Sequence, residues 1–218
     1  MERFAIAIDG PAGAGKSTIA KLLAKRLNII YVDTGAMYRA VALYCIENAF
    51  DYNKKEDVER ALENIDIKIV YQDDNQRILL NNRDVTDLIR TGEVSKGSSA
   101  VATIYAVRIK MVELQRNIAK ENSVVMDGRD IGTYVLPDAN LKIFLTASVE
   151  ERARRRYNEL MEKGIECNLE QIKKEIEQRD KNDSSREFAP LRKADDAIEI
   201  DTTNLTIEEV VEKIIALL

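Results

Sequence analysis

Short apolar runs alternate with helical stretches along this chain. Five runs are brief, mostly apolar and often β-branched, as in strands covered on both faces; they are residues 4–8, 29–32, 124–126, 141–145 and 197–200. This alternation is typical of βαβ units, so it predicts an α/β fold with a parallel sheet. Residues 207–218 place apolar side chains at helical spacing and predict a closing amphipathic helix.

Residues 65–86 interrupt this pattern. Ile65, Ile67 and Ile69 alternate with polar residues, Asp73-Asp74-Asn75 marks a turn, and a second apolar run follows at 78–80. The alternation predicts a short antiparallel hairpin or meander. We therefore expect a small β subdomain inserted into the core.

Two helices are predicted between Ser148 and Lys181 from their start signals. Ser148 is followed three residues later by Glu151, Asn168 offers a similar N-cap, and Gly164 between them is a stop signal. The pair is highly charged and has few apolar residues for a core. Such a segment tends to lie outside the main core and to move.

The composition allows a sizeable core and excludes several kinds of chemistry. Hydrophobic residues make up 45% of the chain, no apolar run is long enough to span a bilayer, and the first residues fit a strand better than a signal peptide. Histidine is absent, which excludes Ser-His or Cys-His catalysis and His-ligated zinc. Cys45 and Cys167 have no metal-ligand spacing, so we expect reduced thiols in a cytoplasmic protein.

The charge distribution favours a small anionic ligand. The net charge of −5 argues against a nucleic acid polymer as partner. Many arginines nevertheless crowd the last third of the chain: Arg152, Arg154, Arg155, Arg156, Arg179, Arg186 and Arg192. We expect small-molecule substrates and no membrane partner. Because no long apolar stripe is left over, we also expect a monomer.

A nucleotide-binding motif follows the first predicted strand. Gly10, Pro11, Ala12, Gly13, Ala14, Gly15, Lys16 and Ser17 fit the P-loop pattern G-x-x-x-x-G-K-[ST]. In this motif the backbone amides cradle phosphates, the lysine reaches the β- and γ-phosphates, and the Ser hydroxyl can ligate Mg²⁺. The motif also opens a predicted helix, as it requires. We expect ATP at these residues and Thr18, Mg²⁺ as cofactor, and Lys16 at an exposed rim.

Two polar clusters follow other predicted strands. They are Asp33-Thr34-Gly35 with Tyr38-Arg39, and Asp127-Gly128-Arg129-Asp130. Because ligands of open α/β sheets bind outside the carboxyl ends of the strands, both clusters should reach the edge that carries the P-loop. Arg39 and Arg129 can each bind a phosphate through paired N–H donors. Asp127 can coordinate Mg²⁺ through a water molecule. Taken alone, each cluster also fits a turn with a solvated arginine.

These motifs together closely resemble the bacterial cytidylate kinase family. The matching residues are Ile8-Asp9 with the P-loop, Asp33-Thr34-Gly35-Ala36-Met37-Tyr38-Arg39, Asp127-Gly128-Arg129-Asp130-Ile131-Gly132-Thr133 and Ala189-Pro190-Leu191. The resemblance covers nearly the whole chain. It includes Ile89-Arg90-Thr91 and Glu93-Val94 of the inserted segment, which other nucleoside monophosphate kinases lack.

The resemblance implies a P-loop kinase of three layers, with a five-stranded parallel sheet, an inserted antiparallel β subdomain and a helical lid. It implies one kinase domain over 1–218, with a core at 1–33, 101–147 and 187–218, a monophosphate-binding subdomain at 34–100 and a lid at 148–186. The implied activity is transfer of the γ-phosphoryl group of ATP to CMP or dCMP.

The resemblance also implies roles for individual residues. It implies that Ser99, Arg108, Asp130 and Arg186 read the cytosine, and that Thr34, Arg179 and Asp183 face the sugar. It implies that Tyr38, Arg39 and Arg129 hold the monophosphate. The implied catalytic residues are Lys16, Arg129, Arg152, Arg155 and Arg156, of which the last three belong to the lid.

Helical spacing bears on two of these sets. Arg152, Arg155 and Arg156 should share one helix face, with Arg154 pointing away. Arg179, Asp183 and Arg186 share a face if the second lid helix extends that far. Both sets also fit exposed, salt-bridged helix faces.

Other functions stay open at this point. The chain could be another small P-loop kinase that acts on UMP, dTMP or shikimate. A switch GTPase is weakened because no Asn-Lys-x-Asp motif is present. A regulatory nucleotide-binding module would have no use for a second basic group at Arg39, Arg129, Arg179 and Arg186. The loop Asp201-Thr202-Thr203 is a candidate for adenine contacts.

Overall fold

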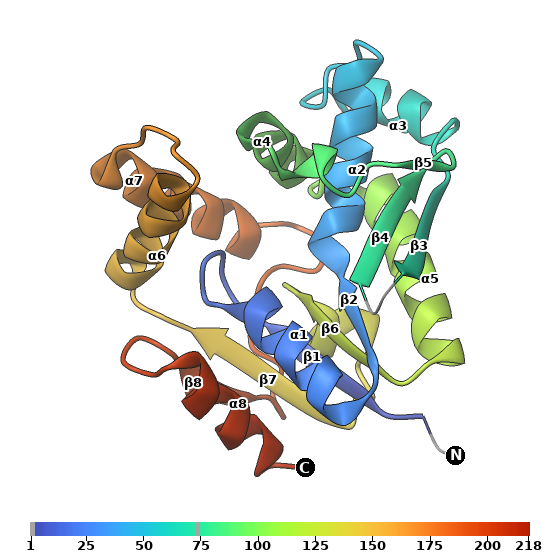
Figure 1. The fold of residues 1–218 in the computed structure, drawn as a ribbon. Helices are drawn as coiled ribbons and strands as arrows, with labels where there is room; N and C mark the ends of the chain where they lie inside the picture. Colours follow the sequence, from blue (N-terminus) through green and yellow to red (C-terminus); the bar gives the residue numbers. More distant parts are fainter. Residues whose placement is uncertain (1–2, 73–74) are drawn as a thin grey trace. The chain divides into compact units, whose positions relative to one another are not determined.

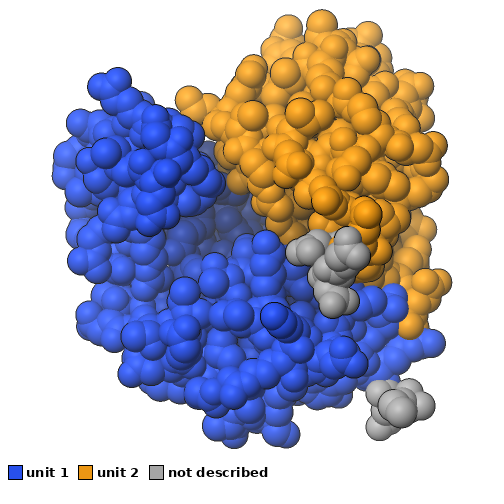
Figure 2. Space-filling model, in the orientation of Figure 1, with its two compact units in different colours: residues 1–31, 122–218 blue, residues 32–121 orange. Residues whose placement is uncertain are grey.

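The computed structural model describes residues 3–72 and 75–218. These residues fall into two compact units, coloured separately in Figure 2: residues 1–31 with 122–218, and residues 32–121. The turn predicted at Asp73-Asp74-Asn75 includes residues 73 and 74, which lie outside the described residues. The expected division into core, subdomain and lid stays a prediction.

A five-stranded parallel sheet carries the P-loop (Figure 1). Its strands are β2 (Ile30–Asp33), β6 (Val124–Gly128), β1 (Ala5–Asp9), β7 (Leu141–Thr146) and β8 (Ile198–Asp201), in that order across the sheet. In the register, Ile8 lies opposite Asp127 of β6 and Ile143 of β7. All five predicted strands are confirmed, and each ends one or two residues later than its apolar run. Most of the residues beyond the apolar runs are aspartates. They continue the strand backbone, but because they are charged they fall outside an apolar pattern.

Helices α1 (Lys16–Leu27) and α8 (Ile207–Ile215) bury their apolar faces in the same core as this sheet. Leu23 of α1, Ile8 of β1 and Val211 of α8 are members of that core. A capping box at Thr206 begins α8, and the predicted closing helix is confirmed as far as Ile215. A five-residue π-helix, η2 (Ile131–Val135), follows β6.

The predicted lid forms two helices, α6 (Val149–Glu162) and α7 (Leu169–Ser184). Ser148 accepts a hydrogen bond from the amide of Glu151, and Asn168 accepts one from Gln171, so both predicted N-caps are confirmed. Gly164 has a φ of 69° after the end of α6, as its role as a stop signal requires. A small apolar cluster of Ala153 on α6 with Ile172 and Ile176 on α7 joins the two helices.

The second unit has its own hydrophobic core, which includes Met37, Ile78 and Met111. Its helices are α2 (Thr34–Glu47), α3 (Lys55–Leu62), α4 (Gly92–Val101) and α5 (Tyr105–Glu121), with a 3₁₀ turn η1 (Leu88–Arg90). The inserted segment forms an antiparallel sheet of β3 (Ile67–Gln72), β4 (Asn75–Leu80) and β5 (Arg83–Asp84). The predicted antiparallel insertion is therefore confirmed.

Two further observations bear on the sequence-based expectations. Cys45 and Cys167 are both free thiols. Across residues 3–72 and 75–218, the structure contains no helix with the length and apolar character needed to cross a membrane.

Candidate functional site

The P-loop lies between β1 and α1, and two of its glycines are required by their surroundings. Gly10 has a φ of 146°, and a Cβ there would lie 2.0 Å from the carbonyl oxygen of Leu145. Gly13 has a φ of 79°, and a Cβ there would lie 3.0 Å from the Cβ of Arg152. Helix α1 then starts without a side-chain cap, so its first amides remain available to an anion.

Lys16 is buried, so the expectation of an exposed rim is wrong. Its side chain turns back under the loop, the residue is 5% exposed, and Nζ donates a hydrogen bond of 2.6 Å to the carbonyl of Pro11. Burial, followed by the positive charge of Arg129, holds the pKa of Lys16 well below its usual value, although Asp127 opposes this. A phosphate would supply the negative charge that this ammonium lacks.

Asp127 is the next-to-last residue of β6, and both of its carboxylate oxygens accept hydrogen bonds. Oδ2 accepts a hydrogen bond of 2.9 Å from Ser17, and Oδ1 accepts one of 2.9 Å from Tyr31. A hydroxyl and a carboxylate are hard oxygen donors that suit Mg²⁺, which usually takes its remaining ligands from water and substrate phosphates. No group of three or more Cys, Asp or Glu side chains gathers as a metal cage in the described ranges. The pair therefore fits a magnesium ion shared with a nucleotide.

Asp183 lies between Arg129 and Arg186, two residues of the predicted site. Its Oδ2 accepts a hydrogen bond of 2.7 Å from Nε of Arg129, and Oδ1 accepts one from Arg186. Burial would raise the pKa of Asp183, but Arg129, Arg186 and Arg179 together lower it to about 2. Asp183 is thus an ionised carboxylate within a strongly basic cluster.

The second lid helix does not extend to Arg186, because α7 ends at Ser184. The condition on which the sequence predicts a shared helix face for Arg179, Asp183 and Arg186 is therefore not met for Arg186. The chain turns after α7, and the amide of Leu191 donates a hydrogen bond of 2.8 Å to the carbonyl of Asp183. Arg186 reaches the Asp183 carboxylate from this turn.

The four arginines of α6 have different surroundings. Arg152 is buried, donates to the P-loop carbonyl of Ala12 at 3.1 Å and pairs with Asp180 at 2.6 Å. Arg156 is partly exposed and pairs with Glu159 on its own helix. Arg154, expected to point away, is exposed and pairs with Glu151.

Arg155 binds the loop after β8. It donates to the Thr202 hydroxyl at 3.0 Å and to the Thr202 carbonyl at 2.6 Å. The Thr202 hydroxyl in turn donates to the carbonyl of Thr146 at 3.1 Å. The role of 201–203 in adenine contacts stays a prediction.

The second unit holds the other predicted acceptor residues. Arg39 donates to the carbonyl of Ile89 at 3.1 Å and to the hydroxyl of Ser95 at 2.7 Å. The buried guanidinium of Arg108 lies 5.8 Å from the ring centroid of Tyr38. Thr34 begins α2 as a buried residue, and Ser99 lies half-buried on α4.

Asp33 organises the start of α2. Its Oδ1 accepts a hydrogen bond of 3.0 Å from the amide of Ala36, and its Oδ2 pairs with Arg90 at 2.9 Å. The Asp33 amide donates to the side chain of Gln76 at 2.8 Å. The inserted β-sheet thus contributes directly to the position of Asp33 and Thr34.

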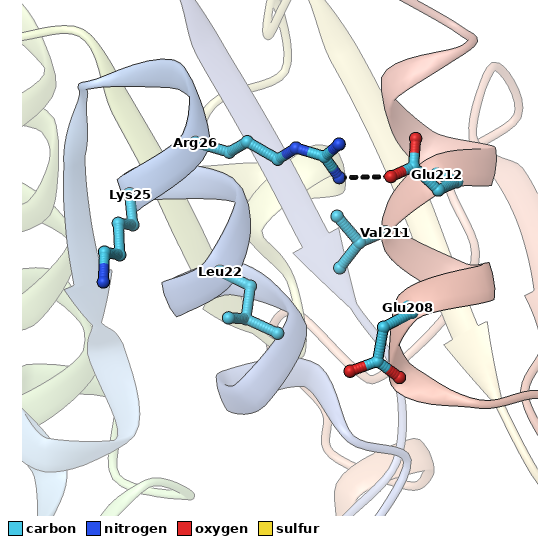
Figure 3. A pocket seen from close by; sticks show the side chains of 6 residues that line it. All are labelled: Leu22, Lys25, Arg26, Glu208, Val211 and Glu212. Carbon is cyan, nitrogen blue, oxygen red and sulfur yellow. Dashed lines mark hydrogen bonds and ion pairs between the residues drawn. The ribbon is translucent and has the colours of Figure 1, made fainter.

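A cavity of about 390 Å³ lies between α1 and α8 (Figure 3). Leu22 and Val211 face it, and the Arg26–Glu212 ion pair crosses it. Its lining includes no predicted site residue and no part of the P-loop, so it is separate from the candidate site.

A family model described as "Cytidylate kinase" matches residues 6–218. The chain belongs to the cytidylate kinase family. A cytidylate kinase of Caldicellulosiruptor saccharolyticus is 56% identical over 217 residues, covering 100% of this chain and 96% of the relative. One of Bacillus cereus is 53% identical over 216 residues, covering 99% and 96%.

A solved shikimate kinase from Bacteroides thetaiotaomicron has a TM-score of 0.51 at 15% identity, covering 98% of this chain and 97% of that one. This likeness shows the P-loop kinase fold alone, which confirms the predicted fold class.

Two residues in the first unit of this cytidylate kinase family member have contacts that were not predicted from the sequence. Asp9 is buried and accepts hydrogen bonds from the amides of Ile131 at 2.8 Å and Gly132 at 2.7 Å. Tyr31 donates a hydrogen bond to Asp127. A carboxylate that ends a buried strand is a usable signal for Asp9, whereas Tyr31 resembles any aromatic residue of a strand.

Proposed function

We propose that this chain transfers the γ-phosphoryl group of ATP to CMP or dCMP, giving ADP and CDP or dCDP. The observation that carries the proposal is a second basic cluster around Asp183 in the unit that holds the P-loop. A nucleotide switch needs one phosphate site, whereas a kinase for a phosphorylated acceptor needs two. Among phosphorylated small molecules, membership of the cytidylate kinase family favours CMP or dCMP as the acceptor.

ATP binds at residues 10–18 in this proposal. The loop amides and Lys16 contact the β- and γ-phosphates, and the buried ammonium of Lys16 is poorly neutralised until they arrive. The structure suits Mg²⁺ at Ser17 and, through water, at Asp127, where it would neutralise charge on the phosphates.

The acceptor nucleotide uses two sets of residues. Arg129, Asp130, Arg179, Asp183 and Arg186 belong to the first unit, and Thr34, Tyr38, Arg39, Ser99 and Arg108 to the second. We assign the monophosphate to Tyr38, Arg39 and Arg129. We assign sugar binding to Thr34, Arg179 and Asp183.

Base choice follows from hydrogen-bonding chemistry. Cytosine offers an amine donor to the carboxylate of Asp130, while its two acceptors take bonds from Ser99, Arg108 and Arg186. Uracil carries an acceptor in place of the amine and would face the carboxylate without a hydrogen bond, so the site disfavours it.

Transfer itself needs positioning and charge neutralisation more than a covalent intermediate. Lys16 and Arg129 would hold the reacting phosphates, and Arg152, Arg155 and Arg156 would supply further positive charge from the lid. Histidine is not needed in this proposal. The reaction requires only that the charge of the γ-phosphoryl group is neutralised and that the group is held in line with the acceptor oxygen. Exclusion of water by the lid would prevent hydrolysis of ATP.

The test is a comparison of acceptors with the purified chain, ATP and Mg²⁺. ADP release would be measured with CMP, dCMP, UMP, AMP, dTMP and shikimate. We expect kcat/KM for CMP or dCMP to exceed that for every other acceptor by at least tenfold. A higher value for another acceptor, or ADP release that is independent of any acceptor, would refute the proposal.

A further inference from the structure

Asp9 is the last residue of β1 and directly precedes the P-loop residue Gly10. It is 5% exposed, and both of its carboxylate oxygens accept backbone hydrogen bonds from η2. Oδ1 binds the amide of Ile131 at 2.8 Å, and Oδ2 binds the amide of Gly132 at 2.7 Å. One carboxylate therefore links the end of β1 to the segment that follows Asp130.

Those two amides need a partner from outside their own helix. The first amides of any helix lack an acceptor within it, and η2 is a π-helix of only five residues. Its own hydrogen bonds run from the amides of Val135 and Leu136 back to Asp130 and Ile131. Such turns are rare and often occur at functional sites. The two bonds from Asp9 fix the start of η2, and with it the backbone direction of Asp130.

Gly132 packs closely against the side chain of Lys142 and also touches the carboxylate of Asp9. A Cβ on Gly132 would lie 3.4 Å from Oδ2 of Asp9 and 3.2 Å from Cδ of Lys142. The ammonium of Lys142 is turned to Asp196 at 2.6 Å. The charge of Asp9 is thus held mainly by backbone amides.

The burial of Asp9 disfavours the charged form of its carboxyl group. Desolvation raises the pKa of Asp9 to about 6, although the amides of Gly132 and Ile131 lower it. A carboxylate kept where its charge is disfavoured is more common at functional sites than elsewhere.

We propose that Asp9 is a positioning residue for the acceptor site. Through the amides of Ile131 and Gly132 it holds Arg129 and Asp130 in place, and its position next to Gly10 ties them to the P-loop. This inference rests on the proposed roles of Arg129 and Asp130 in acceptor binding.

Asp9→Asn tests the inference, because asparagine keeps the shape but can accept only one of the two bonds. The other amide of η2 would face the Nδ2 donor. We expect KM for CMP to rise about tenfold, the effect of one lost bond to a charged group, with KM for ATP changed less than twofold. A residue that only stabilises the fold would not produce this separation between substrates.

Asp138→Asn is the matched control. Asp138 is exposed in the turn after η2, so the variant removes the same charge and should leave both KM values unchanged. Asp9→Ser is the second variant and decides the question if Asp9→Asn does not fold, because a single short hydroxyl cannot accept both hydrogen bonds. It should also raise KM for CMP selectively.

Wild-type KM values in the folded variants, or equal effects on CMP and ATP, would overturn the inference. Asp130→Ala separates this failure from failure of the proposed function. If Asp130→Ala raises KM for CMP and Asp9→Asn does not, the positioning role alone is wrong. If Asp130→Ala leaves KM for CMP unchanged, the acceptor site itself is misassigned and the inference falls with it.

Discussion

The ammonium of Lys16 lies in a buried position, bonded to the carbonyl of Pro11. Because burial and the charge of Arg129 lower its pKa, the charged form is held at a cost in the free protein. In the proposed function, a phosphate bound next to Lys16 would offset that free-energy cost, and the same charge would then favour the transition state of transfer.

Lys16→Met should therefore separate activity from stability. Methionine fills a similar volume without a buried charge, so we expect an unchanged or higher melting temperature. We expect kcat to fall by at least about a hundredfold, as on loss of one preorganised charge or donor. Lys25→Met, on the exposed face of the same helix, should keep normal kcat. Near-normal turnover of Lys16→Met would refute the P-loop assignment.

Arg156 and Arg154 offer a second comparison of single residues. Each pairs with a glutamate three residues away, and their side chains are 38% and 66% exposed. Such exposed pairs contribute little to stability, so alanine variants of both should melt like the wild type. Arg156→Ala should lower kcat at least tenfold, because it removes a charge from the transferring phosphates, whereas Arg154→Ala should change kcat less than twofold. An equal decrease in kcat for the two variants would mean that the arginines act through their charge density and not through their positions on the helix.

At the scale of elements, Asp183 connects α7 to the end of β6 through Arg129. Its pKa in the folded protein, about 2, lies below the ordinary value of 3.8. A carboxyl with a lowered pKa stabilises the fold at all pH values above its ordinary pKa, and the contribution is lost as the pH falls toward the folded value.

Asp183→Asn should therefore lower the free energy of unfolding at pH 7 by roughly 2 kcal/mol. Urea denaturation should show a constant difference from wild type between pH 5 and 7, and a narrowing difference below about pH 4. Asp195→Asn, at an exposed carboxylate, should show no such difference. A gap that widens on acidification would contradict the ionised state of Asp183 between its arginines.

N-caps and apolar spacing predicted most helices and strands, but they did not predict the start of η2 or the end of α7, which lie close to the candidate site. Ser148 and Asn168 were found because an N-cap bonds an amide only three residues away. The π-helix η2 was not predicted, because its first amides are held by Asp9, which is 122 residues distant along the chain. The end of α7 at Ser184 was likewise not visible in the charge spacing of Arg179, Asp183 and Arg186.

At the scale of the whole molecule, the inserted sheet is part of the second unit's core. Ile78 and Leu80 of β4 are buried with residues of α2 and α5. Gln76 on the same strand binds the amide of Asp33, next to Thr34. The inserted sheet therefore shapes the start of α2, where the sugar is proposed to bind.

The fold class, the P-loop and the family could all be predicted from the sequence, because apolar periodicity, N-caps and contiguous motifs are local properties of the chain. The sequence also supplied the residues of the candidate site, whose individual roles stay proposals. The burial of Lys16, the lowered pKa of Asp183 and the hydrogen bonds from η2 to Asp9 became visible only in the folded chain. Each of these depends on desolvation and on partners distant in the sequence, and no local pattern encodes either.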